Sequence, residues 1–300
     1  MIKNFEDIVN LARTKVKRIL SVAVAQDEGV LRAVKYATDE GIIQPILIGD
    51  KEEIEKIANI INMSLDNIEI CHVIDKAEAC RVAVSKVTMG EADMLMKGIV
   101  DTAILLKEVL KKEANLRTGR VISHVGVIDA PTYPRILLVS DAAMTIAPDL
   151  ITKKQIIENS VIVAKSIGIS MPKVAVICAI EKVNDKMPAT VDAKKLEEMN
   201  KKGEIRDCIV GGPLALDNAV SIEAAQHKNI DNPVAGNADV LITPLIEAGN
   251  ILYKTVSFIG DAKVAGVLAG AKVPIIVTSR ADSKEAKLNS IALAMLMASN

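Results

Sequence analysis

Thr278, Ser279 and Arg280 bring two hydroxyls and a guanidinium into one short turn near the end of the 300-residue sequence. The apolar run Val273–Val277 before them predicts a buried parallel strand, and the Ala/Leu-rich segment after Asp282 predicts a helix. Ligands of open parallel sheets bind where such strands end, and the first amides of a helix favour an anion. Hydroxyl, guanidinium and amide groups together therefore predict a phosphate-binding site.

A structural interpretation of the same segment is also open. Asp282 and Glu285 have the spacing of a capping box, in which two side chains satisfy the free backbone amides at the start of a helix. Those two acids would then only begin the terminal helix.

Lys97 and Gly98 form a second polar turn, after the predicted strand Met94–Met96. A lysine and a glycine at a strand end can hold a phosphate, and Asp101 or Thr102 can cap the helix that follows. An ordinary turn with a surface lysine fits the same spacing equally well.

A glycine-rich segment, Gly211-Gly212-Pro213-Leu214, follows the predicted strand Cys208–Val210. Its glycines permit a ligand to approach the backbone closely, but Gly-Gly-Pro is also an ordinary turn. The segment is weak support for a site when it is taken alone.

Asn250, Tyr253 and Lys254 form a further polar group, after the predicted strand Val240–Thr243. If a helix begins near Asn250, the tyrosine and the lysine lie one turn into it, near the same sheet edge. A binding site and an ordinary surface are equally consistent with this pattern.

Residue patterns of other kinds of active site are mostly missing from the sequence. Ser123 and His124 lie inside an apolar run, where a lone histidine is more often a satisfied core group than a base. The sequence has no Gly-x-Ser-x-Gly elbow, no Walker A pattern and no Gly-x-Gly-x-x-Gly after the first strand. Metal-ligand spacing is not visible either. These absences disfavour an acyl-enzyme, nucleotide hydrolysis, standard dinucleotide binding and a metal site.

The composition is typical of an α/β protein. Half of the residues are hydrophobic, with no Trp, two Phe and three Tyr, so Val, Ile, Leu, Ala and Met must build the core. The net charge of −1 and the interspersed charges argue against a nucleic-acid surface. Four scattered cysteines, the absence of a long apolar run and the lack of a signal-peptide layout predict a cytoplasmic protein.

Strand-like and helix-like segments alternate along the chain, which predicts two α/β domains. A polar segment, Asn115–Arg120, precedes two adjacent apolar runs that we interpret as a hairpin opening the second domain. We expect the last strand and helix to return to the first domain, so that the domains are 1–118 plus 269–300, and 119–268. Helices are expected near 5–15, 28–40, 52–61, 77–87, 101–114, 153–166, 191–201, 250–256 and 262–269, and strands near 18–25, 45–49, 68–74, 94–96, 121–128, 135–139, 173–178, 208–210, 240–243 and 273–277.

Eight motifs, in this order and spacing, resemble the phosphate acetyl/butyryltransferase family, and the resemblance covers nearly the whole chain. Within that family, the butyryl-transferring members are the most similar. The motifs are Lys97-Gly98-x-x-Asp101-Thr102, Ser123-His124-Val125, Ser140-Asp141-Ala142-Ala143, Glu181-Lys-Val-Asn184 with Met187-Pro188-Ala-Thr190, Gly211-Gly212-Pro213-Leu214-Ala-x-Asp217, Ala235-Gly236-x-Ala238-Asp239, Gly249-Asn250-x-x-Tyr253-Lys254 and Thr278-Ser279-Arg280.

The resemblance implies a fold and a reaction. The fold would be a two-domain α/β architecture like that of isocitrate and isopropylmalate dehydrogenases, with the site in an interdomain cleft. The reaction would convert an acyl-CoA, butyryl or branched short-chain, and inorganic phosphate into acyl phosphate and CoA by direct transfer. The resemblance also implies a homo-oligomer, with no metal and no redox cofactor held by the protein.

The resemblance also implies roles for particular residues. Ser279 would stabilise the reacting centre, and Arg280 would bind phosphate or CoA. Lys107 falls where the acetyltransferases have a second arginine, so the charge is kept but the bidentate fork is lost. The aspartate proposed as their base falls near Ala286, which cannot do that work, and the adjacent Glu285 becomes the candidate base.

Further substrate contacts are expected from five residues outside that turn. Fixed positive charge for phosphate can come from Lys97 or Lys254 as well as from the arginine. Thr102, Asn250 and Tyr253 are the other candidate substrate-binding residues.

Three alternatives to the butyryl-type transferase remain at this point. A phosphate acetyltransferase would differ only in pocket volume, and one methylene changes affinity by only about 1–3 kcal/mol. A metal- and nicotinamide-dependent decarboxylating dehydrogenase of the same architecture should show an aspartate cluster, which the sequence lacks. A catalytically silent relative would most simply have lost Ser279 or Arg280, and both are present.

Overall fold

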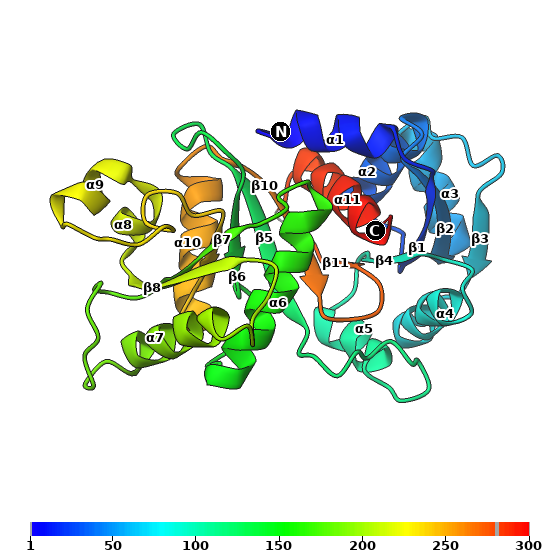
Figure 1. The fold of residues 1–300 in the computed structure, drawn as a ribbon. Coiled ribbons are helices and arrows are strands. Elements are labelled where there is room, and N and C mark those ends of the chain that lie inside the picture. Colours follow the sequence, from blue (N-terminus) through cyan, green and yellow to red (C-terminus); the bar gives the residue numbers. More distant parts are fainter. Residues whose placement is uncertain (1, 280–281, 300) are drawn as a thin grey trace. The chain divides into compact units, whose positions relative to one another are not determined.

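The computed structural model describes residues 2–279 and 282–299, which separate into two compact α/β units (Figure 1). The terminal unit comprises Glu6–Arg120 and Ala265–Asn300, and the central unit comprises Met1–Phe5 and Val121–Val264. The N-terminal segment belongs with the central unit, where the backbone N–H of Phe5 donates to Asp129 Oδ2 at 3.2 Å.

The sheet of the terminal unit has the strand order β3-β2-β1-β4-β11-β10. Its first five strands run parallel, and β10 is antiparallel to β11. The central strands are apolar on both faces because helices cover both, as Val22 and Leu95, both fully buried, illustrate. The strands are β1 Arg18–Ala23, β2 Ile43–Gly49, β3 Glu69–His72, β4 Met94–Lys97, β10 Lys263–Ala269 and β11 Ile275–Ile276.

Three helices of the terminal unit begin at an aspartate that follows a strand. Asp27, Asp50 and Asp75 each accept a hydrogen bond from a backbone N–H in the first turn, which satisfies part of the free helix end. The last helix, α11, packs against α2, and its residues 289–296 are all buried. The helices are α1 Phe5–Arg13, α2 Glu28–Asp39, α3 Lys51–Ile60, α4 Lys76–Thr88, α5 Thr102–Val109 and α11 Lys284–Ala298.

The sheet of the central unit has the order β5-β6-β9-β7-β8. β5 and β6 form the predicted antiparallel pair, and β6, β9, β7 and β8 run parallel. The strands are β5 Ser123–Asp129, β6 Leu137–Ser140, β7 Lys173–Ile177, β8 Ile209–Leu214 and β9 Val240–Ile242, and the helices are α6 Leu150–Ser166, α7 Pro188–Lys201, α8 Leu216–Val220, α9 Ile222–His227 and α10 Ile246–Phe258.

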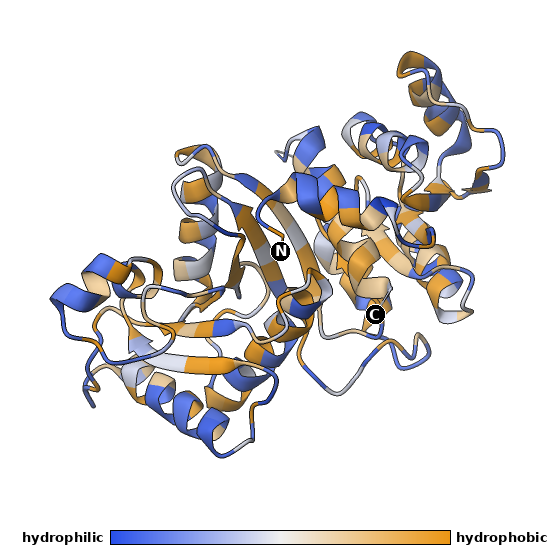
Figure 2. Ribbon diagram, turned by 45° about the horizontal axis from the view of Figure 1, so that its top comes forward, coloured by the Kyte–Doolittle hydropathy of each residue, from blue (hydrophilic) through white to orange (hydrophobic). Residues whose placement is uncertain are grey.

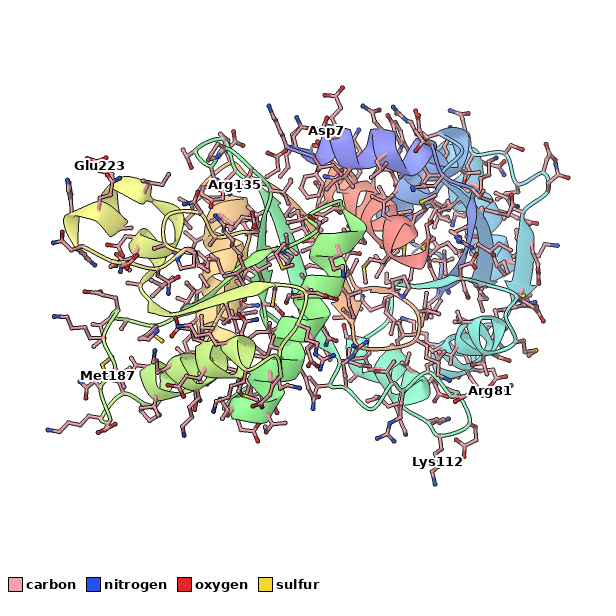
Figure 3. All side chains as sticks on the ribbon, in the orientation of Figure 1. Asp7, Arg81, Lys112, Arg135, Met187 and Glu223 are labelled. Carbon is pink, nitrogen blue, oxygen red and sulfur yellow. The ribbon has the colours of Figure 1, made fainter. Side chains whose placement is uncertain are left out.

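Hydrophobic residues follow the strands in both units, and hydrophilic residues occupy outward helix surfaces (Figure 2). The side chains of Lys112 and Glu223, both exposed, point away from the ribbon (Figure 3). Among the described residues, no helix combines the length and the apolar character that a membrane span requires.

Two local predictions were wrong, one open alternative is excluded, and two short helices were missed. The helix expected near 262–269 is strand β10, whose buried run Val264–Ala269 fits either structure by pattern alone. The Gly211–Leu214 segment is not a turn but the end of β8, where a Cβ on Gly211 would lie 2.4 Å from Asn232 Oδ1. The helix expected to reach residue 114 ends at Val109, and the short helices α8 and α9 were not predicted.

Candidate functional site

Lys97 is the last residue of β4, at the edge where the parallel strands of the terminal unit end. Its side chain is only 6% exposed, and its Nζ donates to the carbonyl oxygens of Gly98 and Val100, at 3.1 Å each. A Cβ on Gly98 would lie 2.0 Å from the carbonyl oxygen of Val24, so only glycine fits there. The lysine therefore stabilises a turn in which the backbone is tightly packed.

Ser279 lies beyond the end of β11, the strand that runs parallel to β4. Its backbone N–H donates to Asp282 Oδ2 at 2.6 Å, and the N–H of Asp282 donates back to the Ser279 carbonyl oxygen at 3.2 Å. The Ser279 amide is thus occupied by Asp282, and the residue is exposed. Arg280, the other residue predicted for this turn, lies outside the described residues.

The predicted capping box between Asp282 and Glu285 is wrong. The N-cap of α11 is Ser283, whose Oγ accepts from the N–H of Ala286 at 3.1 Å. Asp282 instead closes the preceding turn, because its carboxylate reaches back to Ser279. Glu285 is exposed in the first turn of α11.

Two further predicted residues lie on α5. Thr102 is the first residue of the helix, after Asp101 at the N-cap. Lys107 is exposed in the last turn of the same eight-residue helix. The two side chains therefore project from opposite ends of α5, and only Thr102 lies at the end next to Lys97.

In the central unit, a buried aspartate organises the loop after β6. Asp141 is 2% exposed, and its Oδ1 accepts from the backbone N–H groups of His124, Ala143 and Met144 at 3.2, 2.9 and 3.0 Å. Its Oδ2 accepts from the N–H of Thr145 at 3.0 Å. Four amides converge on one carboxylate, and these charge-assisted hydrogen bonds both stabilise the buried group and fix the loop.

Tyr253 and His124 meet at the same sheet edge. Their ring centroids are 5.6 Å apart with an interplanar angle of 82°, an edge-to-face contact. A Cβ on Gly126 would lie 2.6 Å from the Tyr253 ring, so the glycine leaves room for this ring over β5. His124 is 7% exposed, which agrees with the interpretation of a buried histidine.

Asn250 joins α10 to the Asp141 loop, because its Nδ2 donates to the carbonyl oxygen of Ala142 at 2.9 Å. Gly249 permits this approach, since a Cβ there would lie 2.2 Å from the Asp141 carbonyl oxygen. Lys254 is exposed on the same helix, with its Nζ 5.9 Å from the centre of the Phe258 ring.

The structure thus brings together residues that the sequence places far apart. Sequence reasoning did not select Asp141 as a functional residue, although a polar residue followed by Ala-Ala at the end of a strand was the available signal. Asn159 was also missed: its Nδ2 donates to Ser123 Oγ and to the Val121 carbonyl oxygen, at 2.9 Å each. It lies in the middle of a helix, where no local pattern marks it.

A pair of acids lies at the ends of β7 and β8. Lys228 contacts Glu181 at 3.5 Å and Asp217 at 3.2 Å. Backbone N–H donors and this ammonium lower the pKa of both carboxyl groups. Within the described residues, no group of three or more His, Cys, Asp or Glu side chains is arranged to hold a metal ion.

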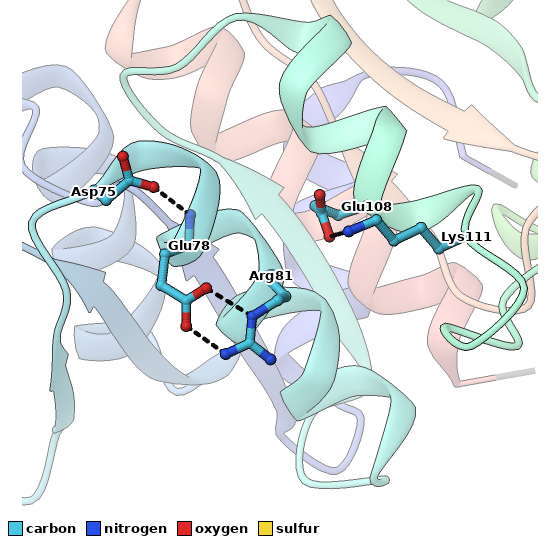
Figure 4. A network of polar contacts seen from close by, with 5 residues as sticks. All are labelled: Asp75, Glu78, Arg81, Glu108 and Lys111. Carbon is cyan, nitrogen blue, oxygen red and sulfur yellow. Dashed lines mark hydrogen bonds and ion pairs between the residues drawn. The ribbon is translucent and has the colours of Figure 1, made fainter.

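A hollow of about 410 Å³ lies on the terminal unit between α4 and α5. Its cations already have partners: Arg81 pairs with Glu78, and Lys111 pairs with Glu108 at 2.6 Å (Figure 4). The hollow lies at the C-terminal ends of these helices, hence at the sheet edge opposite Lys97. None of the predicted site residues lines it, and we do not assign the site there.

The polar turns at the carboxyl ends of parallel strands are those of an α/β enzyme that binds anionic substrates. Residues 4–79 and 72–295 match the family model described as phosphate acetyl/butaryl transferase. The chain is 48% identical over 298 residues to the phosphate butyryltransferase of Clostridium beijerinckii, covering 99% of each sequence. It is 47% identical over 293 residues to the phosphate acetyltransferase of Thermotoga maritima, covering 98% of this chain and 99% of that one. The chain belongs to this transferase family.

Solved structures agree with this assignment. A branched-chain phosphotransacylase from Enterococcus faecalis superposes with a TM-score of 0.84 at 37% identity, covering 94% of this chain and 99% of that one. A 4-hydroxythreonine-4-phosphate dehydrogenase from Burkholderia phymatum has a TM-score of 0.58 at 14% identity, over 95% of this chain and 100% of that one. The second likeness concerns the fold alone.

Proposed function

We propose that this chain transfers an acyl group from an acyl-CoA thioester to inorganic phosphate, with butyryl and branched short chains preferred. The observation that carries the proposal is the 48% identity, over 99% or more of each sequence, to two Clostridium proteins named phosphate butyryltransferase. The name of the Enterococcus faecalis protein, a branched-chain phosphotransacylase, supports the same acyl range.

The proposed reaction is a direct transfer in a ternary complex. A phosphate oxygen attacks the thioester carbonyl carbon, the C–S bond breaks, and CoA leaves as a thiolate that takes up a proton. A thiol pKa near 8.5 makes the thiolate a tolerable leaving group. Holding both substrates in one geometry supplies much of the rate, and no covalent enzyme intermediate is needed.

In the terminal unit, we assign the chemistry to the Ser279 turn. The Ser279 hydroxyl donates to the oxygen that gains charge in the tetrahedral state. The carboxylate of Asp282 accepts from the Ser279 N–H and holds the turn. Arg280 supplies the fixed positive charge for phosphate. Glu285 exchanges the proton of the CoA thiol.

Six further residues are proposed as substrate-binding groups, three in each unit. Lys97 and Thr102 lie at the edge where β4 ends, and Lys107 projects farther along α5. In the central unit, Asn250 and Tyr253 contact the ordered loop and the start of β5, and Lys254 follows on the same helix. We propose that these groups bind phosphate oxygens and the polar parts of CoA.

Acetyl transfer is the second candidate function. The 47% identity to the Thermotoga maritima phosphate acetyltransferase is almost as high as that to the butyryltransferases. The two reactions share every chemical step, and they differ only in the space available to the acyl chain.

We further propose the isocitrate/isopropylmalate dehydrogenase-like form of the α/β fold, with the two units serving as its domains. The dehydrogenase neighbour at a TM-score of 0.58 supports this form. We also propose that the protein acts as a homo-oligomer and holds no resident metal or redox cofactor. The transfer changes no oxidation state, so a redox cofactor has no part in it.

The test is phosphate-dependent release of CoA from a series of acyl-CoAs, acetyl through hexanoyl and isobutyryl, followed with a thiol reagent. We expect the highest kcat/KM at four or five carbons, with no release when phosphate is omitted. A maximum at acetyl would move the assignment to the second candidate. Folded protein that releases no CoA from any of these substrates would overturn both.

A further inference from the structure

Lys287 is a buried lysine in the first turns of α11, and none of the roles above uses it. Its side chain is 5% exposed. Its Nζ donates to one acceptor, the carbonyl oxygen of Asp282, at 2.5 Å. An ammonium group has three N–H donors, so two of them have no acceptor among the described residues.

The other buried lysines show how unusual this environment is. Lys153, 6% exposed, forms an ion pair with Asp192 at 2.7 Å. Lys97, also 6% exposed, donates to two carbonyl oxygens. Within the described residues, Lys287 donates to a single neutral acceptor and has no carboxylate within the 4.0 Å of an ion pair, which neither of the other two lysines combines.

Among the described residues, no carboxylate forms an ion pair with Lys287. A Cβ on Gly29 would lie 3.7 Å from Lys287 Nζ, which places the ammonium beside the first turn of α2, the positive end of that helix. Asp27 is the acid nearest to this point, but its Oδ1 caps α2 by accepting from the N–H of Val30 at 2.9 Å. A buried ammonium in such a place is costly unless an anion joins it.

Lys287 is also connected to the proposed reaction site. It donates to the backbone of Asp282, and the carboxylate of Asp282 accepts from the backbone N–H of Ser279. The two helices that flank the ammonium, α2 and α11, both start at the edge where the parallel strands end, and they pack against each other. That edge is where anionic ligands of open parallel sheets bind.

We infer that Lys287 binds a phosphate group of a substrate, through the two N–H donors that the protein leaves unused. This inference rests on the proposed function, and it adds a residue that neither the motifs nor the resemblance selected. Inorganic phosphate and the phosphates of CoA present the same chemistry to an ammonium, so the ligand class is a phosphate dianion. The assay decides which of the two sources is bound.

The test compares Lys287→Met, which keeps the length of the side chain and removes the charge, with Lys287→Arg, which keeps the charge. Lys284→Met is the matched control, because Lys284 is exposed one turn earlier on the same helix. Three quantities are measured: the KM for inorganic phosphate, the KM for CoA and for dephospho-CoA in the reverse direction, and Tm with and without phosphate.

We expect Lys287→Met to raise one of these KM values about 10- to 100-fold, the loss typical of one charge-assisted hydrogen bond. A higher KM for inorganic phosphate assigns the lysine to that substrate, and a higher KM for CoA that dephospho-CoA does not share assigns it to the CoA 3′-phosphate. Lys287→Arg should recover part of the loss, and Lys284→Met should behave as the unaltered protein.

Stability separates binding from a purely structural role. Replacing an uncompensated buried charge by an apolar group is commonly neutral or stabilising, so Tm without ligand should be unchanged or higher in Lys287→Met. A lower Tm with unchanged KM values would overturn the inference and make the lysine a structural partner of Asp282. If the unaltered protein proves inactive but phosphate raises its Tm, loss of that rise in Lys287→Met would still support the anion site. If phosphate still raises the Tm of Lys287→Met by the same amount, the inference is refuted.

Discussion

At the residue scale, the chain places a few charged groups out of water and satisfies most of them with backbone groups. Asp141 is surrounded by four backbone N–H donors, and Lys97 donates to two carbonyl oxygens. Ser279 is exposed beyond the end of β11, and its backbone N–H donates to the Asp282 carboxylate.

Ser279→Ala should lower kcat about 100-fold and change the KM for phosphate little, because the hydroxyl is assigned to the charge that develops in the transition state. Steady-state kinetics with butyryl-CoA measure this. Ser170→Ala is the control, since Ser170 is exposed in a loop of the central unit. Full activity in Ser279→Ala would make the serine a structural residue of the turn.

The cysteine thiols should react slowly in the native protein. Burial raises the pKa of Cys80 and of Cys178 to about 11 and that of Cys208 to about 12. Burial, followed by the neighbouring Glu69, also raises the pKa of the half-buried Cys71. Because the thiolate is the reactive form and these pKa values lie above neutral pH, the rate should rise about tenfold per pH unit between pH 7 and 9.

Reaction with a thiol reagent measures this directly. Denatured protein should show all four thiols, and Cys71→Ser should remove the fastest phase of the native reaction. A rapid burst of more than one thiol at pH 7 would contradict the burial. The slow reaction also means that protein thiols will contribute little background when released CoA is followed with the same reagent.

At the element scale, the sites depend on loops and glycines that let elements approach closely. Gly98 lets the Lys97 turn lie against the end of β1, Gly126 admits the Tyr253 ring over β5, and Gly249 brings α10 against the Asp141 loop. In each case a Cβ would lie within 2.6 Å of a neighbouring atom, so the glycine is a packing requirement.

Asp141→Asn should lower the stability of the protein by about 2 kcal/mol, because the amide loses the charge that strengthens four hydrogen bonds and its NH₂ faces backbone donors. For a protein of this size Tm should fall by about 3 °C, as thermal unfolding followed by circular dichroism would show. Asp185→Asn is the control, since Asp185 is exposed. An unchanged Tm in Asp141→Asn would mean that the carboxylate does not hold the loop.

The elements also show what sequence alone can and cannot predict. Alternation of strands and amphipathic helices is a local property, so the hairpin β5–β6 and long helices such as α6 were predicted close to their observed bounds. β10 was predicted as a helix because its buried run of six residues shows neither the helical nor the strand period clearly. The choice of Ser283 over Asp282 as N-cap depends on the side chain of Asp282 turning back to Ser279, which spacing does not encode.

At the scale of the whole molecule, the motif order identified the family although the site geometry could not be predicted. The resemblance named the Ser123, Ser140 and Gly249 motifs separately, and only the fold shows that Asp141, His124, Asn250 and Tyr253 meet at one sheet edge. Lys287 had no sequence signal at all, because its significance lies in burial without a counter-ion. The role of such a residue depends on contacts between segments that are distant in the sequence.

The central claim is that phosphate, and not water, accepts the acyl group. The measurement is phosphorus NMR of the protein with butyryl-CoA and inorganic phosphate, with released CoA followed in parallel by its thiol. The account predicts that an acyl phosphate resonance grows in the same amount as free CoA while inorganic phosphate declines. Release of CoA with free butyrate and unchanged inorganic phosphate would show a thioester hydrolase and contradict the account.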